Sequence, residues 1–114
     1  MSLTRVEEVL LDLESAIEDR KTADPENSYV ASLLQGDPDR LLKKIGEEAT
    51  EVILASKSGR PGAVSGEAAD LVFHLMVLLA QHGLGFRDVL ACIDSRSGVS
   101  GFQEKALRRA TKSG

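Results

Sequence analysis

Tryptophan is absent from this sequence of 114 residues, and aromatic residues make up only 4% of it. Since apolar residues reach 42%, the core must be built from leucine, valine, isoleucine and alanine, a mixture that favours packed helices. The single cysteine, Cys92, excludes an intrachain disulfide, and no group of residues has the spacing of a zinc site. We therefore expect a helical protein of the reducing cytoplasm.

An excess of positive charge is also lacking. The formal net charge is −4, which provides no long-range attraction for a nucleic acid or an anionic membrane, so we expect neither as a partner. The first residues, MSLTRVEEVLLDLE, carry acids within their apolar stretch and do not resemble a signal peptide. No uninterrupted apolar run approaches the roughly 18 residues of a membrane span. To bind an anionic substrate, the protein would need a local positive charge, such as that of a bound cation.

Apolar residues recur at steps of three and four along most of the chain, which predicts amphipathic helices. Turn-forming and capping residues set the expected bounds. Thr4 and Glu7 have the spacing of a capping box, Asp37 and Pro38 suit a helix start, and Gly83 suits a helix end. The expected helices span residues 5–22, 27–35, 38–58, 65–82 and 85–96, with a possible further helix from Ser100.

No stretch alternates with the period of a strand, so the sequence predicts an all-α protein. We expect one domain, residues 1–114, folded as an antiparallel bundle of four to five helices. The segment Leu71 to Ala80 is apolar on almost every side except at His74, and one neighbouring helix cannot cover it. Either this helix is central in the bundle or a second subunit covers it, and we predict a homodimer or a higher homo-oligomer.

Two pairs of acids lie at the margins of the apolar faces of consecutive helices. Glu48 and Glu51 share one face of the first helix, and Glu67 and Asp70 share one face of the next, with His74 one turn further on. The turn around Pro61 predicts antiparallel neighbours, whose acidic edges then converge. Four carboxylates in one place repel one another unless a cation intervenes, and hard oxygen ligands suit Mg²⁺ or Mn²⁺.

Ordinary solvation is the simpler explanation for either pair alone. A single Glu-x-x-Glu is common on helices, and the nearby Lys43, Lys44, Lys57 and Arg60 could form surface salt bridges of small energy. The combination is more specific: Glu-x-x-Glu is followed after fifteen residues by Glu-x-x-Asp, on adjoining helices. The combination is therefore a more specific indication of a metal site than either pair, and a solvated face stays open on spacing alone.

Three blocks carry a resemblance to a known family: SYVASLL (28–34), KKIGEEATEVILASK (43–57) and EAADLVFHLMVLLAQHGL (67–84). They resemble the phosphoribosyl-ATP pyrophosphatase family, within the MazG-like superfamily of all-α nucleoside-triphosphate pyrophosphohydrolases. The resemblance covers nearly the whole chain and implies an all-α fold. The family's magnesium ligands fall on Glu48, Glu51, Glu67 and Asp70.

The reaction that the resemblance implies is hydrolysis of phosphoribosyl-ATP between its α and β phosphates. The products are phosphoribosyl-AMP and pyrophosphate, in the second step of histidine biosynthesis. Glu47 or Glu48 would act as general base toward a metal-bound water. Lys43, Lys44 and Arg40 would hold phosphate oxygens, although plain solvation of a helix face explains these cations nearly as well.

Two further residues are weaker candidates for substrate binding. His74 could touch the Asp70 carboxylate or the pyrophosphate, but a hydrogen-bonded histidine at the edge of the core is the more common case. Tyr29 could contact the base or ribose, and ordinary packing explains it equally well. A basic face of the tail, formed by Lys105, Arg108 and Arg109, could approach the ribosyl phosphate.

Two other functions stay open on the sequence. The same acidic residues would serve a housecleaning pyrophosphatase that acts on non-canonical nucleoside triphosphates. A non-catalytic helical dimerisation module would leave the acids merely solvated, and Mg²⁺ would then not stabilise it specifically.

Overall fold

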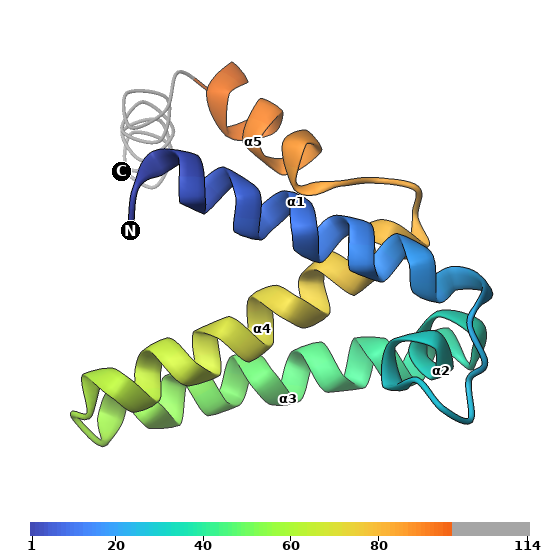
Figure 1. Cartoon of the computed structure of the whole chain (residues 1–114). Helices are drawn as coiled ribbons and strands as arrows, with labels where there is room; N and C mark the ends of the chain where they lie inside the picture. The colour runs from blue at the N-terminus through green and yellow to red at the C-terminus, as the bar shows by residue number, and fades with distance from the viewer. Residues whose placement is uncertain (97–114) are drawn as a thin grey trace, which may run out of the picture. The chain divides into compact units, whose positions relative to one another are not determined.

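The computed structural model of the chain describes residues 1–96, and these residues are helical with no strand (Figure 1). The elements are α1 (Leu3–Asp19), the 3₁₀ helix η1 (Arg20–Thr22), α2 (Tyr29–Gln35), α3 (Pro38–Lys57), α4 (Pro61–Gln81) and α5 (Phe86–Ser95). The all-α prediction is therefore confirmed. The expected helix from Ser100 and the basic face of Lys105, Arg108 and Arg109 lie outside the described residues.

The chain divides into two compact units, and the second begins at Gly85. The first unit, Met1–Leu84, contains α1 to α4 and all the residues predicted to form the site. In the second unit α5 begins as predicted after Gly85, whose amide donates to Oδ2 of Asp88 at 2.8 Å. That bond satisfies one of the amides that a helix start leaves free.

The starts of α1 and α2 differ from the prediction. α1 begins at Leu3 rather than Arg5, because Ser2 is the N-cap and its Oγ accepts from the Arg5 amide at 3.1 Å. α2 begins at Tyr29 rather than Asn27, capped by Ser28. The Asn27 side chain instead donates to Asp24 Oδ2 at 2.7 Å in the preceding turn.

α3 and α4 form an antiparallel helical hairpin, which is the most extensive helix contact in the described part of the chain (Figure 1). α3 begins at Pro38 with Asp37 as its N-cap, as predicted. α4 begins at Pro61, not at Ser65, because proline lacks the amide hydrogen that the first turn of a helix cannot use. Gly59, with a φ of +71°, makes the tight connection possible.

The C-terminal cap of α4 follows the prediction at Gly83. This glycine has a φ of +70°, and its amide donates to the Ala80 carbonyl at 3.0 Å. The Leu84 amide donates to the Leu79 carbonyl at 2.8 Å, which completes a Schellman motif. The end of α4 and of the first unit is therefore set by local chemistry.

Few side chains of the hairpin are fully covered. The apolar core comprises Ile17, Ala31, Leu33, Leu41, Met76 and Val77. Val72 and Leu75 on α4 are each 39% exposed, and Ile53 on α3 is 58% exposed. α4 also has the length and composition of a membrane-crossing helix, a property that it shares with core helices of soluble proteins.

Candidate active site

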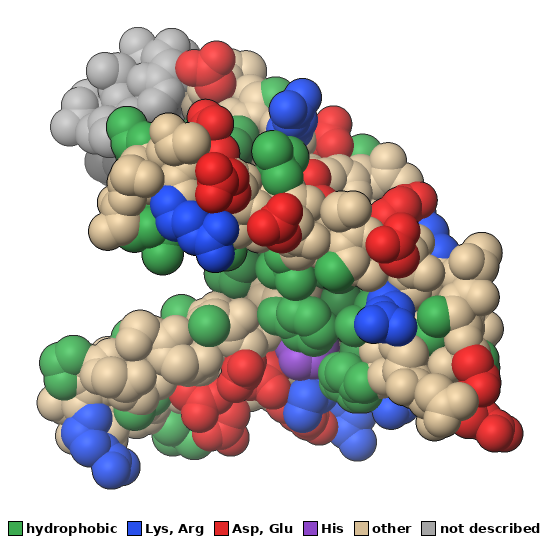
Figure 2. All heavy atoms as spheres, viewed as in Figure 1, with side chains coloured by type: hydrophobic (Ala, Val, Ile, Leu, Met, Phe, Trp, Pro, Cys, Tyr) green, Lys and Arg blue, Asp and Glu red, His purple; other side chains and the backbone are tan. Residues whose placement is uncertain are grey.

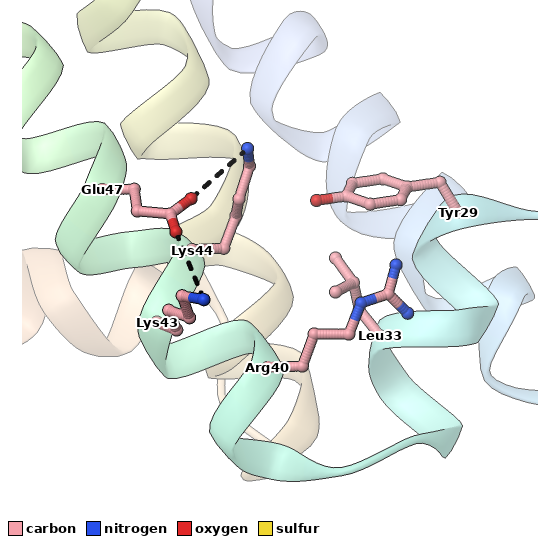
Figure 3. A pocket seen from close by; sticks show the side chains of 6 residues that line it. All are labelled: Tyr29, Leu33, Arg40, Lys43, Lys44 and Glu47. Carbon is pink, nitrogen blue, oxygen red and sulfur yellow. Dashed lines mark ion pairs between the residues drawn. The ribbon is translucent and has the colours of Figure 1, made fainter.

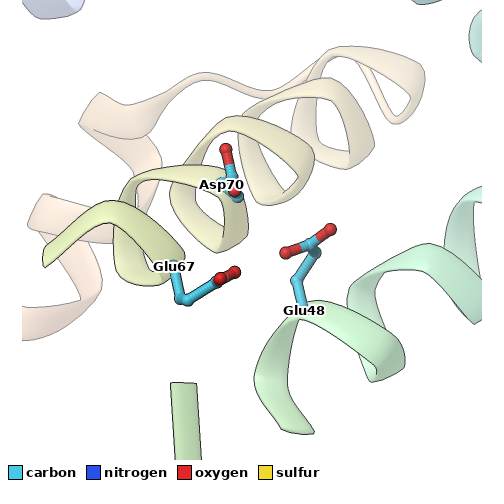
Figure 4. A group of neighbouring side chains, drawn as sticks. All are labelled: Glu48, Glu67 and Asp70. Atoms are coloured by element: carbon cyan, nitrogen blue, oxygen red, sulfur yellow. The ribbon is translucent and has the colours of Figure 1, made fainter. Parts of the chain in front are cut away.

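The acidic cluster joins α3 to α4. Glu48 projects from α3 toward Glu67 and Asp70 on α4, and one carboxylate oxygen from each lies within 4.8 Å of the others (Figure 4). Glu48 is buried, Glu67 is half-buried and Asp70 is exposed, so the cluster runs from the helix interface to solvent. The cluster opens on one side, where a ligand can reach it.

The surroundings of Glu67 disfavour its charged form. Desolvation raises the pKa of Glu67 above its ordinary value of 4.5, and the negative charges of Glu48, Glu51 and Asp70 raise it further. Within residues 1–96 neither Glu67 nor Asp70 forms an ion pair, and Lys44 is the cation that pairs with Glu48. The cluster therefore holds more negative charge than its own neighbours neutralise.

Glu51 differs from the other predicted metal ligands. It lies one turn closer to the hairpin connection, and it is not among the three carboxylates whose oxygens converge. Its charge nevertheless contributes to the raised pKa of Glu67. The structure thus brings together three of the four predicted ligands and places the fourth within electrostatic range.

The donor set of the cluster fits a hard divalent cation. All three converging groups are carboxylates, and no histidine or cysteine belongs to the group. Oxygen ligands on an open site suit Mg²⁺ or Mn²⁺, which keep positions for water or for substrate phosphate. A cation here would also offset the charge that raises the pKa of Glu67.

A cationic hollow lies next to the cluster, toward the N-terminal end of α3 (Figure 3). Its volume is about 290 Å³, and its walls come from α2 and α3: Tyr29, Leu33, Arg40, Lys43, Lys44 and Glu47. Five of these residues were predicted from the sequence as substrate-binding or catalytic groups. Leu33 was missed, although its place in an apolar helical pattern is consistent with its burial as a wall.

Lys44 connects the hollow to the cluster. Its Nζ lies 3.4 Å from Oε1 of Glu48 and 3.9 Å from Oε2 of Glu47. The bond to Glu48, together with that carboxylate's charge, raises the pKa of Lys44 above its ordinary value of 10.5. Lys43 is more exposed and lies 4.0 Å from Glu47, so it contributes mainly its charge.

Arg40 is held by two contacts with α2. Its guanidinium carbon lies 5.8 Å from the centre of the Tyr29 ring, and its Nη1 donates to Oγ of Ser32 at 3.2 Å. Sequence reasoning missed Ser32. The sequence shows Ser32 one turn after Ser28 on the same helix. It does not show that Ser32 lies near Arg40, because that contact depends on how α2 packs against α3.

His74 is buried and makes two hydrogen bonds. Its Nδ1 lies 2.7 Å from the backbone carbonyl oxygen of Asp70, and its Nε2 lies 2.9 Å from the Tyr29 hydroxyl. The contact proposed with the Asp70 carboxylate is therefore replaced by a contact with the Asp70 backbone. Direct substrate binding by His74 stays a prediction.

The distribution of charge over this face is visible in the space-filling view. Over α3 and α4 a group of acidic side chains lies beside lysine and arginine side chains, and further acidic side chains lie over other elements (Figure 2). The acidic cluster and the cations of the hollow thus lie next to each other, with Glu47 among the cations.

Comparison with known proteins identifies the family of the chain. A family model described as phosphoribosyl-ATP pyrophosphohydrolase matches residues 10–97. Similar proteins include those named phosphoribosyl-ATP pyrophosphatase in Burkholderia mallei (strain SAVP1), Burkholderia pseudomallei (strain 668) and Burkholderia thailandensis. Each is 49% identical over 113 residues, which covers 96% of this chain and 93% of the relative. The chain belongs to the phosphoribosyl-ATP pyrophosphohydrolase family, within the MazG-like all-α superfamily.

Proposed function

We propose that the protein hydrolyses phosphoribosyl-ATP between its α and β phosphates, giving phosphoribosyl-AMP and pyrophosphate in histidine biosynthesis. The observation that carries this proposal is the adjacency of three convergent carboxylates and a cationic hollow, joined by the Lys44–Glu48 ion pair. A polyphosphate can bind both, because its oxygens are ligands for a divalent cation and acceptors for lysine and arginine. The family of the chain supports the choice of substrate.

Glu48, Glu67 and Asp70 would hold Mg²⁺ or Mn²⁺, with Glu51 as an additional acid at the side. When bound, the cation would neutralise polyphosphate charge and lower the pKa of a coordinated water. The raised pKa of Glu67, caused first by desolvation and then by the neighbouring carboxylates, is consistent with this assignment because a cation would offset both.

Lys44, Arg40 and Lys43 would bind the phosphate oxygens. Lys44 is best placed to interact with the phosphates nearest the cluster, because it contacts both Glu47 and Glu48. Arg40 is oriented by Tyr29 and Ser32, and the remaining N–H groups of its guanidinium can donate to phosphate oxygens. These cations would also stabilise the charge that develops on the departing pyrophosphate.

We assign the general base to Glu47 rather than Glu48. Glu48 is buried within the cluster, pairs with Lys44 at 3.4 Å and would hold the metal ion. Glu47 lines the hollow and is exposed, and its ion pairs with Lys44 and Lys43 are longer, at 3.9 and 4.0 Å, so it can orient a water and accept its proton. Glu47→Gln is expected to lower kcat without weakening metal binding.

A homodimer in the cytoplasm, without nucleic-acid or membrane partners, completes the proposal. The exposed apolar residues of the hairpin, among them Ile53, Leu54, Val72 and Leu75, support a second copy as the cover. Sedimentation at micromolar concentration tests this, and a monomer would contradict it.

Pyrophosphate release is the decisive measurement for the proposed function. Phosphoribosyl-ATP should be hydrolysed faster than ordinary or modified nucleoside triphosphates, and only when Mg²⁺ or Mn²⁺ is present. A preference for modified triphosphates would replace the proposal with a housecleaning pyrophosphatase. No release from any nucleotide, with a fold that Mg²⁺ does not stabilise, would leave the dimerisation module.

A further inference from the structure

Ser32 connects the backbone of α2 to the side chain of Arg40. Its Oγ lies 2.6 Å from the Tyr29 carbonyl oxygen and 3.2 Å from Nη1 of Arg40. A carbonyl oxygen can only accept a hydrogen bond, so the single hydroxyl hydrogen of Ser32 is directed at Tyr29. The lone pairs of Oγ are left for the guanidinium, which can only donate. The chemistry of the groups therefore determines the direction of both hydrogen bonds.

Arg40 keeps most of its binding capacity in this arrangement. It is exposed, it lines the cationic hollow, and it reaches from α3 toward α2 (Figure 3). Ser32 accepts from one nitrogen, and the Tyr29 ring, centred 5.8 Å from the guanidinium carbon, attracts the charge. The remaining N–H groups form a planar fork that matches the oxygens of a phosphate. The guanidinium is thus held in place with donors left for a ligand.

Arg40 also differs from the two lysines of the hollow in its charge balance. Lys44 pairs with Glu48 and Glu47, and Lys43 pairs with Glu47. Within residues 1–96 no carboxylate forms an ion pair with Arg40. Arg40 therefore carries a positive charge that is fixed in position and is not neutralised by these residues.

The position of Arg40 along α3 separates it from the acidic cluster. Arg40, Lys44 and Glu48 follow one another at steps of four residues on one side of the helix. Since the helix rises about 1.5 Å per residue, Lys44 lies about 6 Å and Arg40 about 12 Å along the axis from Glu48. The phosphorus atoms of a triphosphate are joined by single oxygens, so a triphosphate bound at the cluster extends past Lys44 but not over a further helical turn. Arg40 is therefore placed for a second, separate phosphate.

We propose that Arg40, held by Ser32 as a positioning residue, binds the monophosphate of the ribosyl group that distinguishes the substrate from ATP. The proposal rests on the proposed function for the identity of the substrate. Phosphoribosyl-ATP carries this monophosphate in addition to its triphosphate, whereas an ordinary nucleoside triphosphate has only the triphosphate. Arg40 thus favours phosphoribosyl-ATP over other nucleotides, and the departing pyrophosphate is left to Lys43 and Lys44.

The first experiment compares phosphoribosyl-ATP with ribosyl-ATP, the same nucleotide without the monophosphate. On the full chain with Mg²⁺, the KM of ribosyl-ATP should exceed that of phosphoribosyl-ATP by about tenfold or more, because charged hydrogen bonds are lost. Arg40→Met should bring this KM ratio close to one. Lys44→Met should raise both KM values and keep their ratio. A wild-type ratio near one, or a ratio that Arg40→Met leaves unchanged, would overturn the proposal.

Variants of Ser32 test its positioning role. Ser32→Ala suits a helix and removes only the hydroxyl, so it should lower the KM ratio about threefold, the effect of one neutral hydrogen bond. Combined with Arg40→Met it should have no further effect, because Ser32 acts only through Arg40. Ser32→Thr keeps the hydroxyl and should retain the wild-type ratio. A further loss in the double variant, or an unchanged ratio in Ser32→Ala, would contradict the positioning role.

Ser65→Ala is the matched control for Ser32→Ala. The Oγ of Ser65 also donates to a carbonyl oxygen of its own helix, that of Gly62 at 3.1 Å, but Ser65 does not line the hollow. This variant should leave both KM values unchanged, and melting temperatures measured on all the variants verify that they fold. A lowered ratio in Ser65→Ala would assign the effect to helix stability and overturn the role of Ser32.

The two proposals fail differently. If the wild type is active and Arg40→Met affects both substrates equally, only the inference about Arg40 and Ser32 is wrong. If the wild type releases no pyrophosphate from any nucleotide, the proposed function is wrong, and an NMR titration of the full chain with ribose 5-phosphate then tests Arg40 by itself. Binding that Arg40→Met weakens about tenfold would support a sugar-phosphate site. No binding, or equal binding by both proteins, would overturn it.

Discussion

The acidic cluster and the cationic hollow are built on the same helix and show opposite imbalances of charge. One turn of α3 separates Lys44 from Glu48. Toward α4, the acidic cluster has more carboxylates than cations that pair with them. Toward α2, the hollow is lined by three cations and by one acidic residue, Glu47. Neither region is neutral by itself, and the proposed cation and polyphosphate would each offset one of the two imbalances.

The Lys44–Glu48 pair forms the boundary between these regions. Its 3.4 Å separation and the burial of Glu48 make it a stronger interaction than the longer, exposed pair of Lys43 with Glu47. A chain that only needed a soluble surface would intermix its charges along α3. Segregation of the charges is what a metal–polyphosphate complex requires.

Removing a carboxylate of the acidic cluster should have the largest effect. Asp70→Asn or Glu67→Gln is expected to lower kcat by more than about 100-fold. Mutation of residues that merely hydrogen-bond to metal ligands already lowers activity or metal affinity by about 10- to 100-fold. Without Mg²⁺ the variants should melt at the same temperature as the wild type or slightly higher, since repulsion is relieved. Glu7→Gln, an exposed acid on α1, is the matched control. Wild-type turnover in Asp70→Asn would contradict the metal assignment.

Changing the boundary cation should affect binding more than turnover. Lys44→Met is expected to raise KM by about tenfold, because the variant loses one charged hydrogen bond to the substrate. Lys43→Met removes an equal charge from a side chain that is 80% exposed, and its effect on KM should be smaller. Steady-state kinetics on both variants measures the difference. Equal effects would mean that only the total charge of the hollow matters.

Adding Mg²⁺ should stabilise the acidic cluster specifically. At about ten times its Kd the ion should raise the melting temperature by about 5 °C or more, because it binds the folded state. Glu67→Gln should lose most of this shift, while Lys43→Met should keep it. Thermal melting with and without Mg²⁺, at constant ionic strength, gives the comparison. A shift of the same size in both variants would indicate a general salt effect.

The smallest effect concerns pH in the absence of metal. The folded-state pKa of Glu67 is raised above 4.5, so the folded state retains this proton to higher pH than the unfolded state. The associated stability is fully present below the unfolded pKa and is lost as pH rises through the folded pKa. The melting temperature of the wild type, measured relative to that of Glu67→Gln, should therefore fall as the pH rises from the unfolded to the folded pKa of Glu67. Mg²⁺ should restore the melting temperature of the wild type. A constant difference would mean that Glu67 feels no repulsion.

Local chemistry allowed much of the fold to be predicted. Asp37 with Pro38 and Gly83 mark the ends of their helices correctly, because the side-chain cap and the positive φ are properties of the residues themselves. The starts of α1 and α4 were misplaced. In each case an earlier residue, Ser2 or Pro61, also suits a helix start, and sequence spacing alone does not rank two candidates.

The site was predicted where helical geometry determines it. The faces of α3 and α4 predicted that Glu48, Glu67 and Asp70 would meet, whereas Glu51 falls one turn aside because the hairpin fixes only one register. The partner of His74 could not be predicted. Its bond to Tyr29 spans 45 residues and depends on the packing of α2, and its other partner is a backbone atom that no sequence motif encodes.

The hairpin connection at Gly59 to Pro61 has a consequence for the kinetics of folding. Because a short loop joins α3 to α4, the carboxylates of the cluster come from residues near one another in the chain. Closing a short loop costs little entropy, and proteins dominated by local contacts fold fast. We therefore expect the carboxylates of the acidic cluster to meet early, before the long-range contact between α1 and α4 forms.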